Sequence, residues 1–315
     1  MNKPFISICI PTYKRTDLLK KLLDSILIQT FKNFEILIND NSPDDSVELL
    51  VNSYIPVLPI LYERNRPSVS AGLNCIKVMQ RATAEWVKVM HDDDWFATPD
   101  ALSLFAEAGA DSGKDFIFCA NTQVWLDSDK TEDDILTPQK KQMLDDSTFC
   151  LFYLNVIGHP SVVMHRRDSS IQYDANFNWV LDIDYYMRYF NVHPGYHYIP
   201  QKLVNIGKGA TQESNKYYKN INVELPEYFF LLAKYEADLC LKNEYVFHLI
   251  WNMLKRYKIK KVDQIYATGY KGVMPERIKE VIAFQKNIPR LIIKQTPWSK
   301  RLMKKCFRKI TKKIS

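Results

Sequence analysis

Short apolar runs alternate with longer amphipathic segments through the first 120 residues of the chain. The apolar runs are rich in β-branched residues and are expected to be strands; they cover residues 5–10, 34–38, 58–62, 86–90 and 116–120. Between them, apolar residues recur at spacings of three and four, which predicts helices over residues 16–26 (starting at Thr16 or Asp17), 46–53, 70–81 and 99–110. Repeated units of this length predict an α/β fold, with a Rossmann-like, mostly parallel sheet flanked by helices.

The remainder of the chain follows a different pattern. Residues 121–215 are less regular, with a strand expected near 161–165 and a helix near 182–190. From about 220 to 285, Tyr, Phe and Leu recur at helical spacing. We therefore expect one α/β domain over residues 1–215, followed by a helical C-terminal region over residues 216–315.

Composition and cysteine usage narrow the class of protein. The 315 residues are 46% hydrophobic and 25% charged, which is typical of a folded chain and excludes a disordered or collagen-like one. The six cysteines form no C-x-x-C pair, so a reduced cytoplasmic protein without a zinc site is expected. The N-terminal apolar run is too short for a secretory signal, and no segment approaches the ~20 apolar residues of a spanning helix. We do not expect an integral membrane protein.

Polar residues follow the expected strands at the points where the strands end. They are Pro11-Thr12-Tyr13-Lys14-Arg15, Asp40-Asn41-Ser42, residues 63–66 and His91-Asp92-Asp93-Asp94. In an open parallel sheet, ligands bind outside the carboxyl ends of the strands, so these groups should share one edge. An aromatic ring to stack a base, carboxylates and cations together suit a nucleotide diphosphate. Tyr13 as a packing residue and Asp40 in an Asx turn are the structural alternatives.

The acidic run is the strongest candidate for a metal site. Asp92, Asp93 and Asp94 lie between the apolar run 86–90 and the aromatic pair Trp95-Phe96. Three adjacent carboxylates repel one another unless a cation neutralises them. Oxygen ligands favour Mg²⁺ or Mn²⁺ over zinc. A solvated surface loop is the alternative, because acidic runs are common without a metal.

Several of these motifs occur in an order that resembles a known family. The stretches I-C-I-P-T-Y-K-R, L-x-x-S-I-x-x-Q-T-F-K-N-F-E-I-L-I-N-D-N-S and H-D-D-D-W resemble family 2 glycosyltransferases with the GT-A fold. The resemblance is close over residues 5–120 and looser to about residue 215. It implies that residues 1–120 form the nucleotide-sugar-binding half of the domain and residues 121–215 the acceptor half.

The resemblance also implies the residues that bind the donor. They are Pro11, Thr12, Tyr13, Arg15, Asp40, Asn74, Asp92 and Asp93. The D-x-D motif of the family falls on His91-Asp92-Asp93, where His91 replaces the usual first carboxylate. Asp93 is then the expected ligand of a divalent metal, Mn²⁺ or Mg²⁺, and Asp92 is expected near the ribose. Asp94 is expected to support the loop.

The catalytic base is expected further along the chain. Residues 181–188, L-D-I-D-Y-Y-M-R, resemble the E-D-x-x-x-x-x-R stretch of the family, which selects Asp182 as the base, with Leu181 in place of Glu. Asp184 is the competing candidate. A purely structural helix N-cap is the alternative for Asp182. His159 is expected in a surface turn, and Lys208 is a candidate for contact with phosphate.

The implied activity is an inverting, metal-assisted transfer of one sugar from a nucleotide-sugar donor to a hydroxyl of a glycan or polyprenyl-linked saccharide, as in O-antigen or capsule assembly. A sugar-nucleotide-binding protein without catalysis is the first alternative, because His91 and Leu181 depart from the family pattern. A nucleotidyltransferase is the second, although the loop over residues 11–15 lacks the required glycines. No G-x-G-x-x-G occurs, which disfavours a dehydrogenase.

The C-terminal tail carries the excess positive charge of the chain. Residues 286–315 contain eleven Lys and Arg and no Asp or Glu, so the net charge of +7 divides into +11 for the tail and −4 for the rest. Trp298, Leu302, Cys306 and Ile310 recur at i+4. Such a helix is expected to contact an anionic membrane surface, at the inner face of the cell membrane. A docked helix and a disordered tail are the alternatives; nucleic acid is not expected as a partner.

Overall fold

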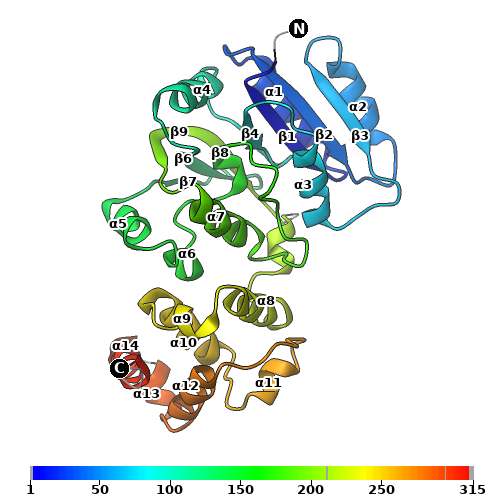
Figure 1. The fold of residues 1–315 in the computed structure, drawn as a ribbon. Coiled ribbons are helices and arrows are strands. Elements are labelled where there is room, and N and C mark those ends of the chain that lie inside the picture. The colour runs from blue at the N-terminus through cyan, green and yellow to red at the C-terminus, as the bar shows by residue number, and fades with distance from the viewer. Residues whose placement is uncertain (1–2, 211, 295, 312–315) are drawn as a thin grey trace. The chain divides into compact units, whose positions relative to one another are not determined.

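The computed structural model describes residues 3–210, 212–294 and 296–311, and its ribbon is drawn in Figure 1. The chain divides into two compact units. The first comprises Met1–Lys141, Ile157–Asn176 and Asp184–Gln212, and the second comprises Gln142–Val156, Phe177–Ile183 and Glu213–Ser315. Compact units need not be separately folding domains, so the predicted domain boundary at residue 215 stays a prediction.

The first unit is built on one sheet, with the strand order β3-β2-β1-β4-β8-β6-β9-β5 and with β7 paired to β6 (Figure 1). The strands are β1 (Ile6–Thr12), β2 (Phe34–Asp40), β3 (Ile60–Arg64), β4 (Trp86–Val89), β5 (Asp94–Phe96), β6 (Phe116–Trp125), β7 (Thr131–Asp134), β8 (Val163–Arg166) and β9 (His197–Lys208). β1 runs parallel to β2 and β4, and β2 runs parallel to β3, whereas β8 is antiparallel to both of its neighbours. The predicted α/β fold is confirmed, and the sheet also contains antiparallel strands.

Helices flank this sheet (Figure 1). Those that contribute to the first unit are α1 (Thr16–Leu27), α2 (Ser46–Tyr54), α3 (Ala71–Gln80), α4 (Ala101–Asp111), α5 (Pro138–Asp146) and α7 (Leu181–Val192), of which α5 and α7 also contain residues of the second unit. In α1, the apolar residues that predicted the helix are its buried face: Leu19, Leu22, Leu23 and Ile26 are all inaccessible to solvent. Burial of one apolar stripe is the main reason why such a segment is helical in the folded protein.

Strand β6 is longer than the sequence pattern indicates. The predicted strand ends at residue 120, whereas β6 continues to Trp125. Its second half is polar and only partly buried, so no apolar run marks it. The strand continues because it pairs with β9, where Trp125 lies opposite Lys208, and with β7 on its other side. Backbone hydrogen bonds hold this part of the sheet, and they leave little trace in the sequence.

The second unit is helical, as the spacing of its apolar residues predicts. Its helices are α6 (Cys150–Tyr153), α8 (Ile221–Lys234), α9 (Ala237–Cys240), α10 (Glu244–Arg256), α11 (Asp263–Tyr266), α12 (Glu276–Lys286), α13 (Arg290–Lys294) and α14 (Thr296–Thr311). Short 3₁₀ turns occur in the two units, at Glu213–Lys216 in the second and at Pro160–Val162 in the first. α10 has the most complete apolar face, with Phe247, Ile250, Trp251 and Leu254 buried.

The basic tail helix α14 packs within this unit. Met303, Cys306 and Ile310 are buried, and the ring of Phe307 lies edge-on to Phe247 of α10, with 5.1 Å between their centroids. The apolar face of the tail therefore contacts protein, as in the docked alternative. Trp298, which was predicted to belong to this face, is instead 52% exposed. The part of the tail beyond residue 311 lies outside the described residues.

Among the helices that the structure describes, none combines the length and the apolar character that a membrane-spanning helix requires.

Candidate functional site

The parallel register brings the predicted donor-binding loops to one edge of the first unit. Thr12 at the end of β1 lies opposite Asp40 at the end of β2, which in turn lies opposite Arg64 of β3. The backbone N–H of Asn41 donates to the carbonyl of Thr12 at 3.0 Å, so the two loops are joined beyond the strands. These loops lie together because the strands that precede them are parallel neighbours.

Asp92 ties the acidic run to the loop after β1. Its Oδ2 accepts hydrogen bonds from the hydroxyl of Thr12 at 2.7 Å and from the backbone N–H of Tyr13 at 3.2 Å. The guanidinium of Arg15 pairs with Asp92 and also, at 2.7 Å, with Asp93. Burial raises the pKa of Asp92 to about 6, against the opposing effect of Arg15. Arg15 thus neutralises part of the charge that the acidic run carries.

His91, Asp93 and Asp94 form a cluster, here called the acidic cluster, that has the composition of a cation site. Each offers a ligand atom, and these atoms lie within 4.8 Å of one another. Burial, followed by the charge of Asp93, raises the pKa of Asp94 well above its ordinary value, as expected for crowded, buried carboxyls. An imidazole nitrogen and two carboxylates are suitable ligands for Mn²⁺, so the residues fit the implied metal. Of the three, only Asp93 was predicted as a ligand.

Gly207 of β9 lies directly against the backbone of the acidic run. Its backbone N–H donates to Oδ1 of Asp94 at 3.0 Å. A Cβ atom at residue 207 would lie 2.2 Å from the carbonyl oxygen of Asp93. Only glycine lets the strand approach the acidic run this closely.

Asp40 and Asn74 bind other protein groups at the edge of the site. Asp40 is fully buried; its two oxygens accept from the backbone N–H of Ser42 at 2.7 Å and the hydroxyl of Tyr62 at 2.8 Å. The amide of Asn74 donates to the carbonyl oxygen of Asn39 at 3.1 Å. Both residues fix the loops around the site, and their donor-binding role stays a prediction.

Pro11 lies at the end of β1 and Tyr13 directly after it, in the segment that was expected to hold the base. The Tyr13 ring is 49% exposed, and the ammonium of Lys14 lies 5.1 Å from its centroid. Pro11 is the penultimate residue of β1 and is partly buried. A half-exposed aromatic ring at the end of a buried strand offers a face on which a nucleotide base can stack, and base stacking by Tyr13 stays a prediction.

The side chains of Lys208 and His159 lie near the acidic cluster. Lys208 Nζ lies 3.1 Å from Nε2 of His159. Burial, then the charges of Lys208 and His91, lowers the pKa of His159 to about 3, so this imidazole is neutral. Burial also lowers the pKa of Lys208, opposed by Asp94 and Asp93. His159 is partly exposed and directly precedes the 3₁₀ turn Pro160–Val162, and the fold brings it close to Lys208.

Asp182 lies in the first turn of α7, within the second unit. It accepts hydrogen bonds from the backbone N–H of Ile183 at 3.0 Å and from Asn155 at 3.1 Å, and burial raises its pKa to about 6. Because the helix begins at Leu181, Asp182 is not its N-cap. The competing Asp184 is fully buried and pairs with Arg188 at 2.8 Å. The assignment of Asp182 as the base stays a prediction.

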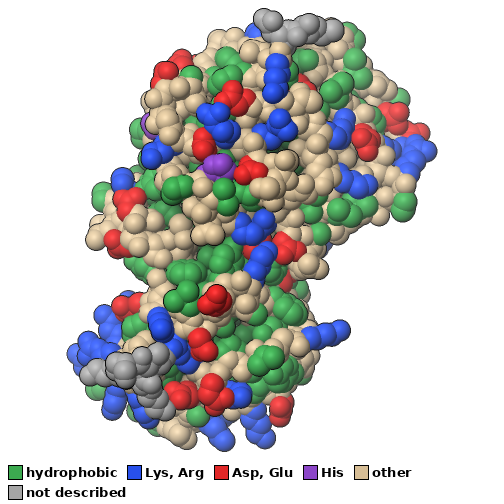
Figure 2. Space-filling view, in the orientation of Figure 1, with side chains coloured by type: hydrophobic (Ala, Val, Ile, Leu, Met, Phe, Trp, Pro, Cys, Tyr) green, Lys and Arg blue, Asp and Glu red, His purple; other side chains and the backbone are tan. Residues whose placement is uncertain are grey.

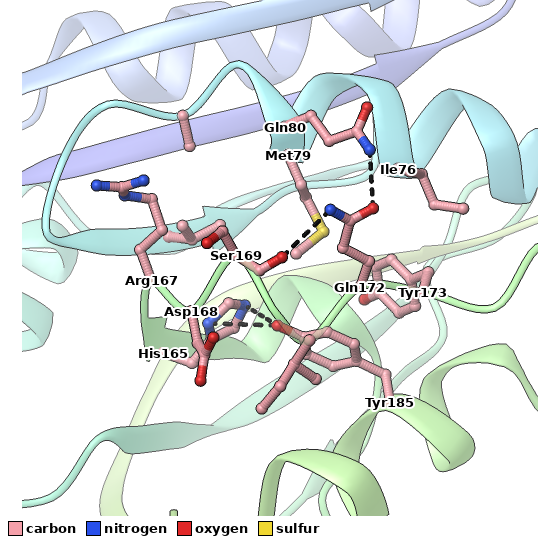
Figure 3. Close-up of a pocket in the computed structure, with 13 residues that line it drawn as sticks. Ile76, Met79, Gln80, His165, Arg167, Asp168, Ser169, Gln172, Tyr173 and Tyr185 are labelled. Atoms are coloured by element: carbon pink, nitrogen blue, oxygen red, sulfur yellow. Dashed lines mark hydrogen bonds between the residues drawn. The ribbon is translucent and has the colours of Figure 1, made fainter. Parts of the chain in front are cut away.

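A separate pocket lies between the end of α3 and the segment that follows β8 (Figure 3). None of its lining residues belongs to the acidic cluster. Its polar side chains bond to one another: Gln80 donates to Gln172 at 2.7 Å, and the hydroxyl of Tyr185 lies 3.0 Å from Nε2 of His165. Arg167 and Asp168 also line this pocket.

Comparison with known proteins identifies relatives of this chain. An uncharacterized glycosyltransferase of Rickettsia prowazekii is 26% identical over 197 residues, which is 60% of this chain and 59% of the relative. Abequosyltransferase RfbV of Salmonella typhimurium is 32% identical over 128 residues, 39% of this chain and 37% of the relative. The chain thus spans about three fifths or less of the length of these relatives.

Solved structures share the fold. S. aureus TarS 1–349 in complex with UDP superposes with a TM-score of 0.58 at 12% identity, covering 97% of this chain and 90% of that one. Mannosyltransferase PcManGT from Pyrobaculum calidifontis, in complex with GDP-Man and Mn²⁺, gives a TM-score of 0.55 at 13% identity, covering 99% and 87%. The GT-A fold predicted from the motifs is therefore confirmed. Since the family model for glycosyl transferase family 2 matches residues 7–173, more than half of the sequence, the chain belongs to that family.

Proposed function

We propose that the protein transfers one sugar from a nucleotide-sugar donor to a hydroxyl group of a glycan or lipid-linked saccharide, with inversion at the anomeric carbon. The observation that carries the proposal is the acidic cluster with Arg15 and the exposed ring of Tyr13 at the carboxyl edge of parallel strands. The names of the structural neighbours, which record UDP, UDP-GlcNAc and GDP-Man complexes, support a nucleotide-sugar donor.

The loop after β1 and the acidic run would hold the donor. The half-exposed ring of Tyr13 stacks on the base, since every base presents a π-face. Asp92, which is already fixed by Thr12, lies beside this loop and is suited to accept a hydrogen bond from the ribose. The cations Arg15 and Lys208 flank the acidic cluster and are placed to interact with the diphosphate. Asp40 and Asn74 maintain the shape of the base-binding loop.

The acidic cluster would hold a divalent metal, Mn²⁺ or Mg²⁺, through His91, Asp93 and Asp94. When bound, such an ion neutralises the negative charge that develops on the departing diphosphate. Arg15 pairs with Asp93 in the ligand-free protein, so its guanidinium already supplies positive charge at this position.

The acceptor hydroxyl needs a base because its pKa lies far above 7. In the proposed reaction the acceptor oxygen attacks the anomeric carbon and forms the new glycosidic bond. The bond to the diphosphate breaks on the opposite face, and the nucleoside diphosphate leaves with the electron pair. Asp182 takes the proton of the acceptor hydroxyl. No covalent enzyme intermediate is required.

The raised pKa of Asp182 predicts an acid limb in the pH profile of transfer. The carboxyl has a pKa of about 6, so it is ionised at pH 7 and mostly protonated at pH 5. A protonated carboxyl cannot accept the proton of the acceptor, so the rate at saturating substrate should fall roughly tenfold from pH 7 to pH 5. Initial rates measured from pH 5 to 8 test this. Donor binding should be measured at the same pH values, because Asp92 also has a pKa of about 6. A flat rate profile would contradict the role of Asp182.

A thermal-shift screen of UDP-, GDP-, dTDP- and CDP-sugars tests the donor class. We expect one class of nucleotide to raise the melting temperature when Mn²⁺ is present and to lose most of this effect in EDTA. If a donor stabilises the protein and nucleoside diphosphate is released once an acceptor is added, sugar transfer is supported. Stabilisation without any turnover or donor hydrolysis would favour the alternative, a sugar-nucleotide-binding protein that lacks catalysis. Failure of every donor to bind would contradict both.

We further propose that the basic tail contacts an anionic membrane surface, which suits a lipid-linked acceptor. Lys and Arg side chains gather over the part of the second unit where α14 lies (Figure 2). Those of α14 that are exposed are Lys300, Arg301, Lys304, Lys305, Arg308 and Lys309. Because Met303, Cys306 and Ile310 are buried, the contact would be electrostatic, aided by the exposed Trp298, which favours membrane interfaces.

Charge reversal tests this membrane contact. The triple variant Lys300→Glu, Arg301→Glu, Lys305→Glu should lose most of its co-sedimentation with vesicles that contain anionic lipid, since each basic residue contributes about 1 kcal/mol near such a surface. The matched control reverses three exposed lysines of the first unit, Lys32, Lys114 and Lys130. Equal binding to neutral and anionic vesicles, or equal losses in both triple variants, would refute the proposal.

A further inference from the structure

Lys88 is a fully buried lysine on β4, three residues before His91. Lysine is almost never fully buried without a charged partner, because its ammonium must leave water. Burial lowers the pKa of Lys88 to about 8. The ammonium donates hydrogen bonds to the backbone carbonyls of Ser161 and, at 3.3 Å, Val163, and it lies 4.6 Å from the ring centroid of Phe105. A group that is costly to bury calls for a physical explanation.

These hydrogen bonds lie where the pairing between two strands stops. β4 pairs with β8 only through Trp86 opposite Arg166 and Val87 opposite His165. Beyond Val87 the backbone ladder ends, and the side chain of Lys88 spans the gap to the 3₁₀ turn that precedes β8. An apolar side chain at this position would leave two buried carbonyl groups without this donor.

Ser161, the residue that Lys88 holds, contacts the acidic cluster directly. Its hydroxyl oxygen accepts the backbone N–H of His91 at 2.9 Å. A continuous set of hydrogen bonds therefore runs from the Lys88 ammonium, through Ser161, to the backbone of His91 in the acidic cluster.

We propose that Lys88 is a positioning residue for cation binding: by holding the carbonyl of Ser161 it fixes the Ser161 hydroxyl, which keeps His91 in the arrangement that binds a divalent cation. The inference rests on the metal site described under Proposed function and extends it to a residue that contacts neither metal nor donor. It explains why a charged side chain, rather than an aliphatic one, occupies a core position in β4.

Binding of Mn²⁺ alone, followed by the EPR signal of the free ion, tests this role. Lys88→Met keeps an unbranched side chain that is one atom shorter and removes its charge and donors. We expect its Mn²⁺ affinity to fall by about 10–100-fold, the range found for partners that orient metal ligands, and we expect Ser161→Ala to lose a similar amount. The control is Val89→Ala. Val89 lies on the same strand but packs on the opposite side, with Cys9 and Leu37. This variant should lose stability and keep its Mn²⁺ affinity.

The double variant Lys88→Met, Ser161→Ala separates a shared path from two independent effects. If Lys88 acts through Ser161, the fold-loss of Mn²⁺ affinity in the double variant equals the larger of the two single losses. If the two residues act independently, the fold-losses of the single variants multiply. If Lys88→Met folds and binds Mn²⁺ with wild-type affinity, the inference about Lys88 is wrong while the proposed metal site stands. The same conclusion follows if Val89→Ala loses as much Mn²⁺ affinity as Lys88→Met. Absence of Mn²⁺ binding by the wild-type chain would overturn both the proposed metal site and this inference. If Lys88→Met does not fold, unchanged affinity in Ser161→Ala overturns the inference.

Discussion

Replacing Asp182 with Asn is expected to reduce sugar transfer by a factor of about 10²–10⁴, the usual contribution of a positioned general base. The amide matches the carboxylate in size, so the contacts with Asn155 and with the N–H of Ile183 can be largely retained. It cannot accept the proton of the acceptor hydroxyl. Donor binding should be almost unchanged, because within the described part of the chain Asp182 bonds to Asn155 and Ile183 and not to the residues proposed to bind the donor.

Initial rates of transfer and nucleotide affinity by calorimetry, measured on the same preparation, test this prediction. Asp184→Asn is the informative comparison, since Asp184 is the competing candidate and pairs with Arg188. Its melting temperature must be recorded, because removing one member of a buried pair destabilises a protein. Wild-type turnover by Asp182→Asn, with turnover lost in a folded Asp184→Asn protein, would transfer the role of base to Asp184.

Asp93→Asn is expected to abolish metal-dependent donor binding. Asp93 is the one residue of the acidic run that both lies in the acidic cluster and pairs with Arg15. Its loss removes a charged ligand, so Mn²⁺ affinity should fall by more than the roughly 10–100-fold that outer-shell partners cost. The fold should persist, because the hydrogen bonds of Asp92 with Thr12 and of Asp94 with Gly207 do not involve Asp93.

Calorimetric titration of the nucleotide found in the donor screen, with and without Mn²⁺, measures this effect. The control is Asp133→Asn, which removes an exposed carboxylate of the same unit that pairs with Lys202 at 2.8 Å. It should bind nucleotide as the wild type does. Equal nucleotide affinity in Asp93→Asn and the wild type, in the presence of Mn²⁺, would exclude Asp93 as a metal ligand.

The local pattern predicted the elements around the site because each of them buries one face. Leu19, Leu22 and Leu23 recur at helical spacing since α1 packs on the sheet, and the run Phe34–Asp40 is apolar at its start because β2 is buried throughout. Parallel neighbours then place the ends of β1, β2 and β4 at one edge. The donor loop and the acidic run could therefore be found from the sequence.

The residues that the sequence did not reveal come from contacts between distant segments. Lys208 was named as a candidate for phosphate contact, but its closeness to His159 follows only from the pairing of β9 with the sheet. Lys88 is a single charge in an apolar strand, and its partner Ser161 is 73 residues away. In α14, i+4 spacing alone placed Trp298 in the apolar face, whereas Trp298 is exposed and Met303 is buried instead.

The bond between Gly207 and Asp94 spans 113 residues of sequence. Closing a loop of that length costs conformational entropy before the contact returns any stability, so contacts of this kind form late in folding. A ribosome releases the chain from its N-terminus, and the whole acidic run emerges long before β9 is synthesised. We therefore expect a nascent chain to carry every residue of the run while lacking the strand that holds it in place. The order of synthesis delays the assembly of the site until the first unit is almost complete.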